Sequence, residues 1–160
     1  MKKILFFTIS TLLIASVFVG CSKDDDKGNP QALIGTWEVV GVTVSSNGVE
    51  ISMDIDDNEI ITFNADGTFI STEDGIGTYT TKGWSLSYTY VDKDGNTQVM
   101  AEGATITEID EDTGLEVTIK IKKLTYSVSG ENLTLTVEAE GTIMGMKITT
   151  VTKARYKKVN

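Results

Sequence analysis

The fold of this 160-residue chain is decided by the stretch ITFNADGTF at residues 61–69. Apolar and polar residues alternate before and after its centre, which is the period of a strand with one buried face. At the centre, Asp66-Gly67 supplies the positive-φ position that a tight turn needs. The stretch therefore predicts a hairpin with strands at residues 59–63 and 68–72.

Short apolar alternations separated by turn residues continue on both sides of this hairpin. The expected strands are residues 35–44, 49–53, 59–63, 68–72, 77–81, 84–91, 97–109 and 115–128, then a strand led by Leu133, Leu135 and Val137, and a closing strand at 146–159. Within 115–128 the apolar side chains change parity around Lys122 and Lys123, which predicts a bulge or a strong bend.

The composition favours strands over helices. Hydrophobic residues make up 40% of the chain, Val, Ile and Thr are prominent, and there are fifteen glycines against one proline. About eight to ten sequential strands joined by short turns form a meander, and closing a meander removes its two exposed edges. We therefore expect an all-β protein, an antiparallel up-and-down barrel over residues 31–160. A β-sandwich is the alternative, although its Greek-key crossovers usually need longer connections.

The N-terminal segment has the anatomy of a secretion signal. A basic start at residues 2–3 precedes an apolar run at residues 4–18, and Gly20 stands directly before the only cysteine, Cys21. This arrangement resembles a bacterial lipoprotein signal. The resemblance implies that residues 1–20 are removed and that Cys21 carries a diacylglycerol on its sulfur and an acyl chain such as palmitate on its amine. A plain secretory signal or an uncleaved anchor is the alternative.

Residues 21–30 are polar and acidic without apolar periodicity, which predicts a solvated tether between the anchor and the domain. The run SKDDD at residues 22–26 resembles the signal that sends Bacteroidota lipoproteins to the outer face of the outer membrane. It implies a lipid-anchored protein that faces the cell exterior. A soluble spacer of arbitrary charge is the alternative.

The charge and the residue types exclude several classes of function. The formal net charge is −9, and such an acidic chain repels phosphate backbones, so nucleic acid is not an expected partner. The chain has no histidine, which removes the commonest general base and any imidazole metal ligand. It also lacks a Gly-rich phosphate loop. We expect neither an enzyme nor a cofactor-binding protein.

Two acidic loops contain the oxygen ligands that calcium prefers. One holds Asp54, Asp56, Asp57 and Glu59, and the other holds Asp92, Asp94 and Asn96. The second loop has its glycine at the fourth position, whereas an EF-hand needs it at the sixth. We expect solvated turns and no metal site.

The segment Gly35-Thr36-Trp37 resembles the Gly-x-Trp motif that opens lipocalins. The order of the later strands, down to Arg155-Tyr156 near the end, is similar to the lipocalin-like domains of Bacteroidota lipoproteins. The resemblance implies a lipocalin-like barrel whose floor is formed by Gly35 and Trp37, with Arg155 packed over the tryptophan. Arg155 and Tyr156 are adjacent, unlike the Arg-x-Tyr pair that binds fatty-acid carboxylates.

Aromatic side chains at the inward period of several strands are the candidates to line a ligand cavity. They are Phe63, Phe69, Tyr79, Trp84, Tyr88 and Tyr90. Small residues such as Gly77 would leave room between them. A filled core is the ordinary alternative for such a pattern.

Two functions follow from these expectations. The first is a lipid-anchored cell-envelope protein whose barrel binds a small apolar or amphipathic molecule. The second is a non-catalytic structural or adhesion module that contacts a partner protein or a glycan. The ligand and the oligomeric state stay open.

The lipid anchor gives the first testable prediction. Replacement Cys21→Ala should release a soluble form, because it removes the acylated residue. Detergent phase partitioning and mass spectrometry of the N-terminal peptide measure this. An unmodified peptide that runs from Met1 to Lys23 in the mature protein would contradict the prediction.

Overall fold

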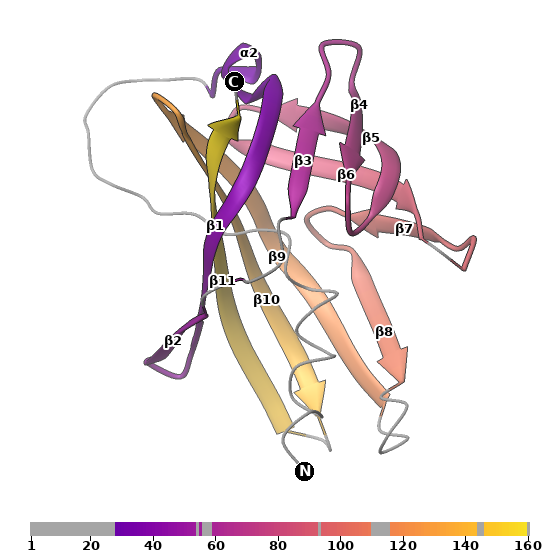
Figure 1. The fold of residues 1–160 in the computed structure, drawn as a ribbon. Helices are drawn as coiled ribbons and strands as arrows, with labels where there is room; N and C mark the ends of the chain where they lie inside the picture. The colour runs from indigo at the N-terminus through magenta and orange to yellow at the C-terminus, as the bar shows by residue number, and fades with distance from the viewer. Residues whose placement is uncertain are drawn as a thin grey trace.

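In the computed structural model, eight antiparallel strands close into a barrel and three further strands pair at its edges (Figure 1). The structure describes residues 28–53, 55, 59–92, 94–109, 116–143 and 146–159. The expected signal peptide, Cys21 and most of the expected tether lie outside these residues.

The elements follow one another along the chain with short connections. They are α2 (Pro30–Leu33), β1 (Gly35–Ser46), β2 (Val49–Met53), β3 (Ile60–Phe63), β4 (Thr68–Ser71), β5 (Gly75–Lys82), β6 (Ser85–Val91), β7 (Thr97–Met100), β8 (Thr105–Ile109), β9 (Glu116–Ser129), β10 (Asn132–Ile143) and β11 (Met146–Val159).

The barrel strands stand in their order along the chain. The sequence of neighbours is β1, β3, β4, β5, β6, β9, β10 and β11, and β11 returns to pair with β1. The strands β9 and β10 lie side by side and complete the ring (Figure 1). This order confirms the expected up-and-down barrel, and the alternative of two stacked sheets is wrong.

The three remaining strands extend the barrel at one end. The first residues of β1 pair with β3, from Gly35↔Phe63 to Glu38↔Ile60, and its last residues pair with β2. In the same way β9 pairs first with β8 and later, at Thr125, with Ser85 of β6. The long strands β1, β9, β10 and β11 therefore run past the short ones, with β2 and β8 beside them (Figure 1).

The hairpin at residues 59–72 is present as expected. Phe63 and Phe69 face each other across β3 and β4, and the amide of Asn64 donates to the carbonyl of Thr68 at 2.9 Å. The Asp66 carboxylate accepts hydrogen bonds from the amide of Thr68 at 2.9 Å and from its hydroxyl at 2.6 Å. Gly67 has a φ of 84°, the left-handed conformation that the Asp-Gly pair predicted.

The change of parity in β9 is also confirmed. Val117, Ile119 and Ile121 are buried before it, whereas Leu124 and Tyr126 are buried after it. The two lysines between them, at positions 122 and 123, both face solvent and form ion pairs with Glu140 and Glu138 of β10. The change of parity lies where β9 stops pairing with β8 and begins to pair with β6, so the two halves of β9 pair with different strands.

The single strand expected over 97–109 is two strands. A turn closed by a 3.0 Å hydrogen bond from the amide of Ala104 to the carbonyl of Ala101 separates β7 from β8. Gly103 in this turn has a φ of 87°. The chain therefore pairs with β6 before the turn and with β9 after it, and it changes direction between the two strands.

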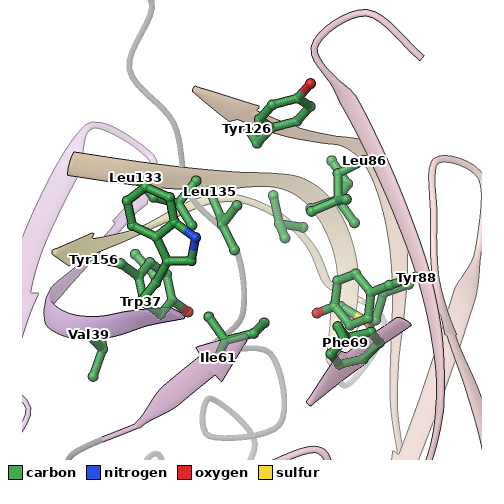
Figure 2. Packing of buried hydrophobic residues seen from close by; sticks show 14 of the residues in the cluster. Trp37, Val39, Ile61, Phe69, Leu86, Tyr88, Tyr126, Leu133, Leu135 and Tyr156 are labelled. Carbon is green, nitrogen blue, oxygen red and sulfur yellow. The ribbon is translucent and has the colours of Figure 1, made fainter. Parts of the chain in front are cut away.

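Trp37 closes the floor of the barrel, beneath α2. Its indole Nε1 donates to the carbonyl of Leu33 at 2.8 Å, and both side chains are fully buried. Asn29 caps α2 by accepting the amide of Gln31, and Pro30 occupies the first turn, where its missing N–H costs nothing. Figure 2 shows Trp37 beside Tyr156 in the core.

The expected contact between Trp37 and Arg155 is wrong. Lys158 faces Trp37 across β1 and β11, and its Nζ lies 5.2 Å from the centre of the indole ring. Arg155 faces Gly41 and is exposed. The reason is the period of two, because Lys158 shares its face with buried Tyr156 whereas Arg155 points outward.

Loss of the floor gives a stability prediction. Replacement Trp37→Ala should lower the free energy of unfolding by about 3–5 kcal/mol, because it removes a fully buried ring and leaves a cavity. Urea denaturation measures the change. The matched control is Trp84→Ala, where the ring is 40% exposed and the expected loss is about 1 kcal/mol or less. Equal losses at the two sites would contradict the assignment of Trp37 as the floor.

Candidate functional site

A polar group lies inside the barrel, beyond Trp37 and toward the end opposite the β5–β6 turn. It is built around Glu59, directly before β3, and Asp74, in the turn between β4 and β5. The amide of Ile60 donates to the hydroxyl of Thr72 at 3.0 Å, and the amide of Thr72 donates to the carbonyl of Ile60, so the two segments are held together. We call Glu59 and Asp74 the carboxyl pair.

The turn that carries Asp74 is shaped by Ser71. The Ser71 hydroxyl accepts hydrogen bonds from the amides of Glu73 and Asp74 at 3.2 and 3.1 Å. This is the local pattern by which serine side chains replace a backbone partner in turns. It folds the chain back so that Asp74 points inward while Glu73 is exposed.

Glu59 is 6% exposed, which is rare for a carboxyl group. The Tyr156 hydroxyl donates to its Oε1 at 3.5 Å. Tyr156 lies on β11, on the wall across the interior from β6, and Figure 2 shows it and Tyr88 pointing inward from opposite walls. The carboxyl group thus has a weak contact in place of a full set of hydrogen bonds.

Asp74 meets the tyrosines of β6. Tyr90 hydrogen-bonds to its carboxyl group, yet Oδ2 is buried and has no hydrogen-bond partner within the described part of the chain. The rings of Tyr88 and Tyr90 stack with centroids 6.1 Å apart, and Tyr88 meets Phe69 edge-on at 5.2 Å. The cluster therefore combines carboxyl oxygens with aromatic walls.

Burial shifts the protonation of the carboxyl pair. It raises the pKa of Glu59 to about 8, with a smaller contribution from the negative charges of Asp74 and Glu73. The pKa of Asp74 rises to about 7, again first through burial. The same burial, with the nearby carboxylates, raises the pKa of Tyr88 and Tyr156 well above the ordinary value. At neutral pH the cluster can therefore donate as well as accept hydrogen bonds.

Most of the expected lining residues do face the interior. Phe63, Phe69, Tyr88 and Tyr90 are all buried. Tyr79 is partly buried, but its hydroxyl donates to the carbonyl of Asn64 at 2.8 Å and so belongs to the β3–β4 turn.

Two expectations about the lining are wrong. Trp84 lies in the turn before β6, outside the barrel, because the strand begins only at Ser85. Gly77 does not leave open room, since a Cβ there would lie 2.5 Å from the ring of Phe69 and 2.1 Å from the carbonyl oxygen of Thr89. Gly77 instead lets the Phe69 ring pack onto the backbone of β5.

The carboxyl pair and Tyr156 were not expected as site residues. Glu59 shares the parity of Ile61 and Phe63, so the alternation of β3 already placed it on the inner face. Tyr156 likewise has the parity of buried Ala154. Nothing local marks Asp74, because an aspartate in a turn is ordinary.

The acidic turn at Asp92 is held by hydrogen bonds of the Asp92 side chain. The Asp92 carboxylate accepts the amides of Asp94 and Asn96 at 3.0 and 2.8 Å and the side-chain amide of Gln98 at 2.9 Å. These bonds lower its pKa, with the Gln98 contact the largest cause. Across the residues that the structure describes, no three acidic, histidine or cysteine side chains are grouped to hold a metal ion. Asp54, Asp56 and Asp57 lie outside those residues.

Comparisons with known proteins give no family for this chain. No family model matches it, and no curated protein does. Among solved structures it is similar to the ywiB protein from Bacillus subtilis, with 11% identity, a TM-score of 0.41, and coverage of 78% of this chain and 91% of that chain. A likeness of this degree assigns neither a family nor an activity. In the described ranges, no helix has the length and apolar character to cross a membrane.

The raised pKa of Glu59 predicts how stability depends on pH. A carboxyl group whose pKa is higher in the folded state binds more protons there, so its stabilisation is fully present below about pH 4.5 and is lost as the pH rises through about 8. As the pH rises from about 5 to about 9, the free energy of unfolding should fall less for Glu59→Gln than for the parent protein. The difference between the two losses should be on the order of 2–4 kcal/mol. Urea denaturation at several pH values measures this.

The control for this pH experiment is Glu50→Gln on the exposed strand β2. It removes one carboxylate of the same chemistry from a solvated position, so its pH profile should follow that of the parent protein. Parallel profiles for all three proteins would show that Glu59 is not protonated in the folded state.

Proposed function

We propose that this protein is a lipid-anchored protein of the outer membrane whose barrel binds a small amphipathic molecule without catalysing a reaction. The observation that carries the proposal is Glu59, a carboxyl group that is almost completely buried next to the apolar core of the barrel. The lipid anchor rests on the sequence around Cys21. The barrel fold is compatible with binding in its interior.

The energetics of the carboxyl pair favour a binding role. Burial of a carboxyl group without full hydrogen bonding destabilises a fold, and an apolar side chain of similar size would serve the core better. Glu59 has only the long contact with Tyr156, and Asp74 keeps one buried oxygen without a partner in the described chain. A ligand that bonds to these oxygens would recover this loss.

The surroundings of the carboxyl pair define the class of ligand. Phe69, Leu86 and Tyr88 offer apolar and aromatic surface for the body of the molecule. The carboxyl oxygens and tyrosine hydroxyls offer hydrogen bonds to its polar group. A basic group such as an amine is favoured over a carboxylate, because the carboxyl pair repels anions and a bound cation would lower its pKa.

A second function is supported by the outer surface of the same barrel. Ile70, Ile76, Val91 and Val99 are exposed on the neighbouring strands β4 to β7, and Ile70 faces Ile76 directly. Serine and threonine occupy the other outward positions of β5 and β6, except for Lys82 at the end of β5. This face, which carries one charge at its edge, suits a structural or adhesion module that contacts a protein or a glycan.

Binding of a defined probe tests the first function. An apolar fluorescent probe with a primary amine should bind the domain with a micromolar Kd or better, which is a binding free energy of about 8 kcal/mol. Its carboxylate analogue should bind at least about tenfold more weakly. Tyr88→Trp should weaken both probes by narrowing the interior. Fluorescence titration measures the affinities.

Matched variants assign the preference to the carboxyl pair. Glu59→Gln should abolish the preference for the amine and leave the fold unchanged by circular dichroism, whereas the exposed control Glu50→Gln should keep it. If neither probe binds the parent protein while glycan or protein partners bind the outer face, the adhesion function is the correct one.

A further inference from the structure

We infer that the floor end of the barrel rests on the bilayer that holds the acyl chains of Cys21, with the Trp84 side chain in the membrane interface. The inference rests on the lipid anchoring proposed above and adds the contact surface and the orientation of the domain. It leaves the carboxyl pair at the end of the barrel that faces away from the membrane.

The first step is the place where the chain joins the barrel. Gly28 is buried against the turn between β5 and β6, so closely that a Cβ on it would lie 2.2 Å from the carbonyl oxygen of Gly83 and 2.9 Å from the amide of Trp84. From there the chain passes through α2 to the floor at Trp37. The chain is therefore already packed against the barrel at Gly28.

The second step is the reach of the anchor. Seven residue steps separate Cys21 from Gly28, and a chain of that length spans at most about 25 Å. Because Gly28 is fixed on Gly83, the membrane lies within that distance of the β5–β6 turn.

The third step is the chemistry of this turn. Trp84 is 40% exposed, and its ring lies against buried Tyr126 with centroids 5.8 Å apart. Lys82, two residues earlier, is exposed, and Val159 is exposed at the same end of the barrel. A tryptophan with a nearby lysine matches the polarity of the headgroup region, where the indole body is apolar and its N–H and the ammonium group stay hydrated.

Because the protein is already anchored, a small contact between Trp84 and the lipid is enough to orient the domain. Once the acyl chains are inserted, the turn is confined near the surface, and its contact with lipid becomes an intramolecular step at high effective concentration. One exposed aromatic side chain could not bind a membrane alone, but here it only has to orient a protein that is already attached.

Fluorescence quenching in vesicles tests the inference. The full lipidated chain is inserted into phosphatidylcholine vesicles with brominated acyl chains, a zwitterionic lipid that does not repel the acidic protein. Trp37 is fully buried, so the bromine atoms should quench the emission of Trp84 alone. We expect the Trp84 emission to fall by roughly half, and this quenching should disappear in Trp84→Phe.

A second reporter provides the control for orientation. In the Trp84→Phe background, Ile76→Trp places an exposed indole next to the turn at the opposite end of the barrel, and its emission should be quenched at least about fivefold less than that of Trp84. Equal quenching of the two reporters, or none for Trp84, overturns the orientation. Flotation of the vesicles separates the two proposals. If the protein floats with the vesicles but Trp84 is not quenched, the anchor is correct and the docking is wrong. If the protein does not float, both the anchor and the docking are wrong.

Discussion

The barrel depends on the hydrogen bonding of β1 along both of its edges. On one side β1 pairs with β11 from Thr36↔Val159 to Ser46↔Thr150, and on the other it pairs with β3 and then with β2. The first strand of the sheet is thereby joined to the last. The ring that results has no free edge in its closed part, which removes the row of unpaired amides and carbonyls that an open meander would expose.

Closure also makes the two ends of the barrel different. At the floor, Trp37 donates to the carbonyl of Leu33 and the Lys158 side chain lies over its ring, so this end is filled by side chains. At the other end, the carboxyl pair stands at the beginning of β3 and in the β4–β5 turn. The carboxyl pair thus lies toward the end of the barrel opposite the β5–β6 turn, where β3 begins and where β4 turns into β5.

The carboxyl pair is the part of the interior that packing does not explain. Apolar side chains from the strands around it form one continuous core. Glu59 keeps its place in that core as a neutral acid, since burial raises its pKa to about 8. A protonated carboxyl group lowers the cost of burial but still needs hydrogen-bond partners, and Tyr156 at 3.5 Å supplies only a weak one.

Local sequence patterns predicted most of the strands, the principal turns and the order of the barrel, but they missed the break between β7 and β8. The Asp66-Gly67 turn, the switch of parity at Lys122 and Lys123 and the last strand from Met146 to Val159 were all predictable, because each rests on the period of two or on turn chemistry between near neighbours. The side-chain contacts inside the barrel, in contrast, follow from the closed fold. It placed Lys158 over Trp37 in place of Arg155, packed Phe69 onto Gly77, turned Trp84 outward, and brought Asp74 toward Glu59 and Tyr156. These contacts depend on the register between distant strands and on the curvature of the closed sheet, which no local pattern encodes.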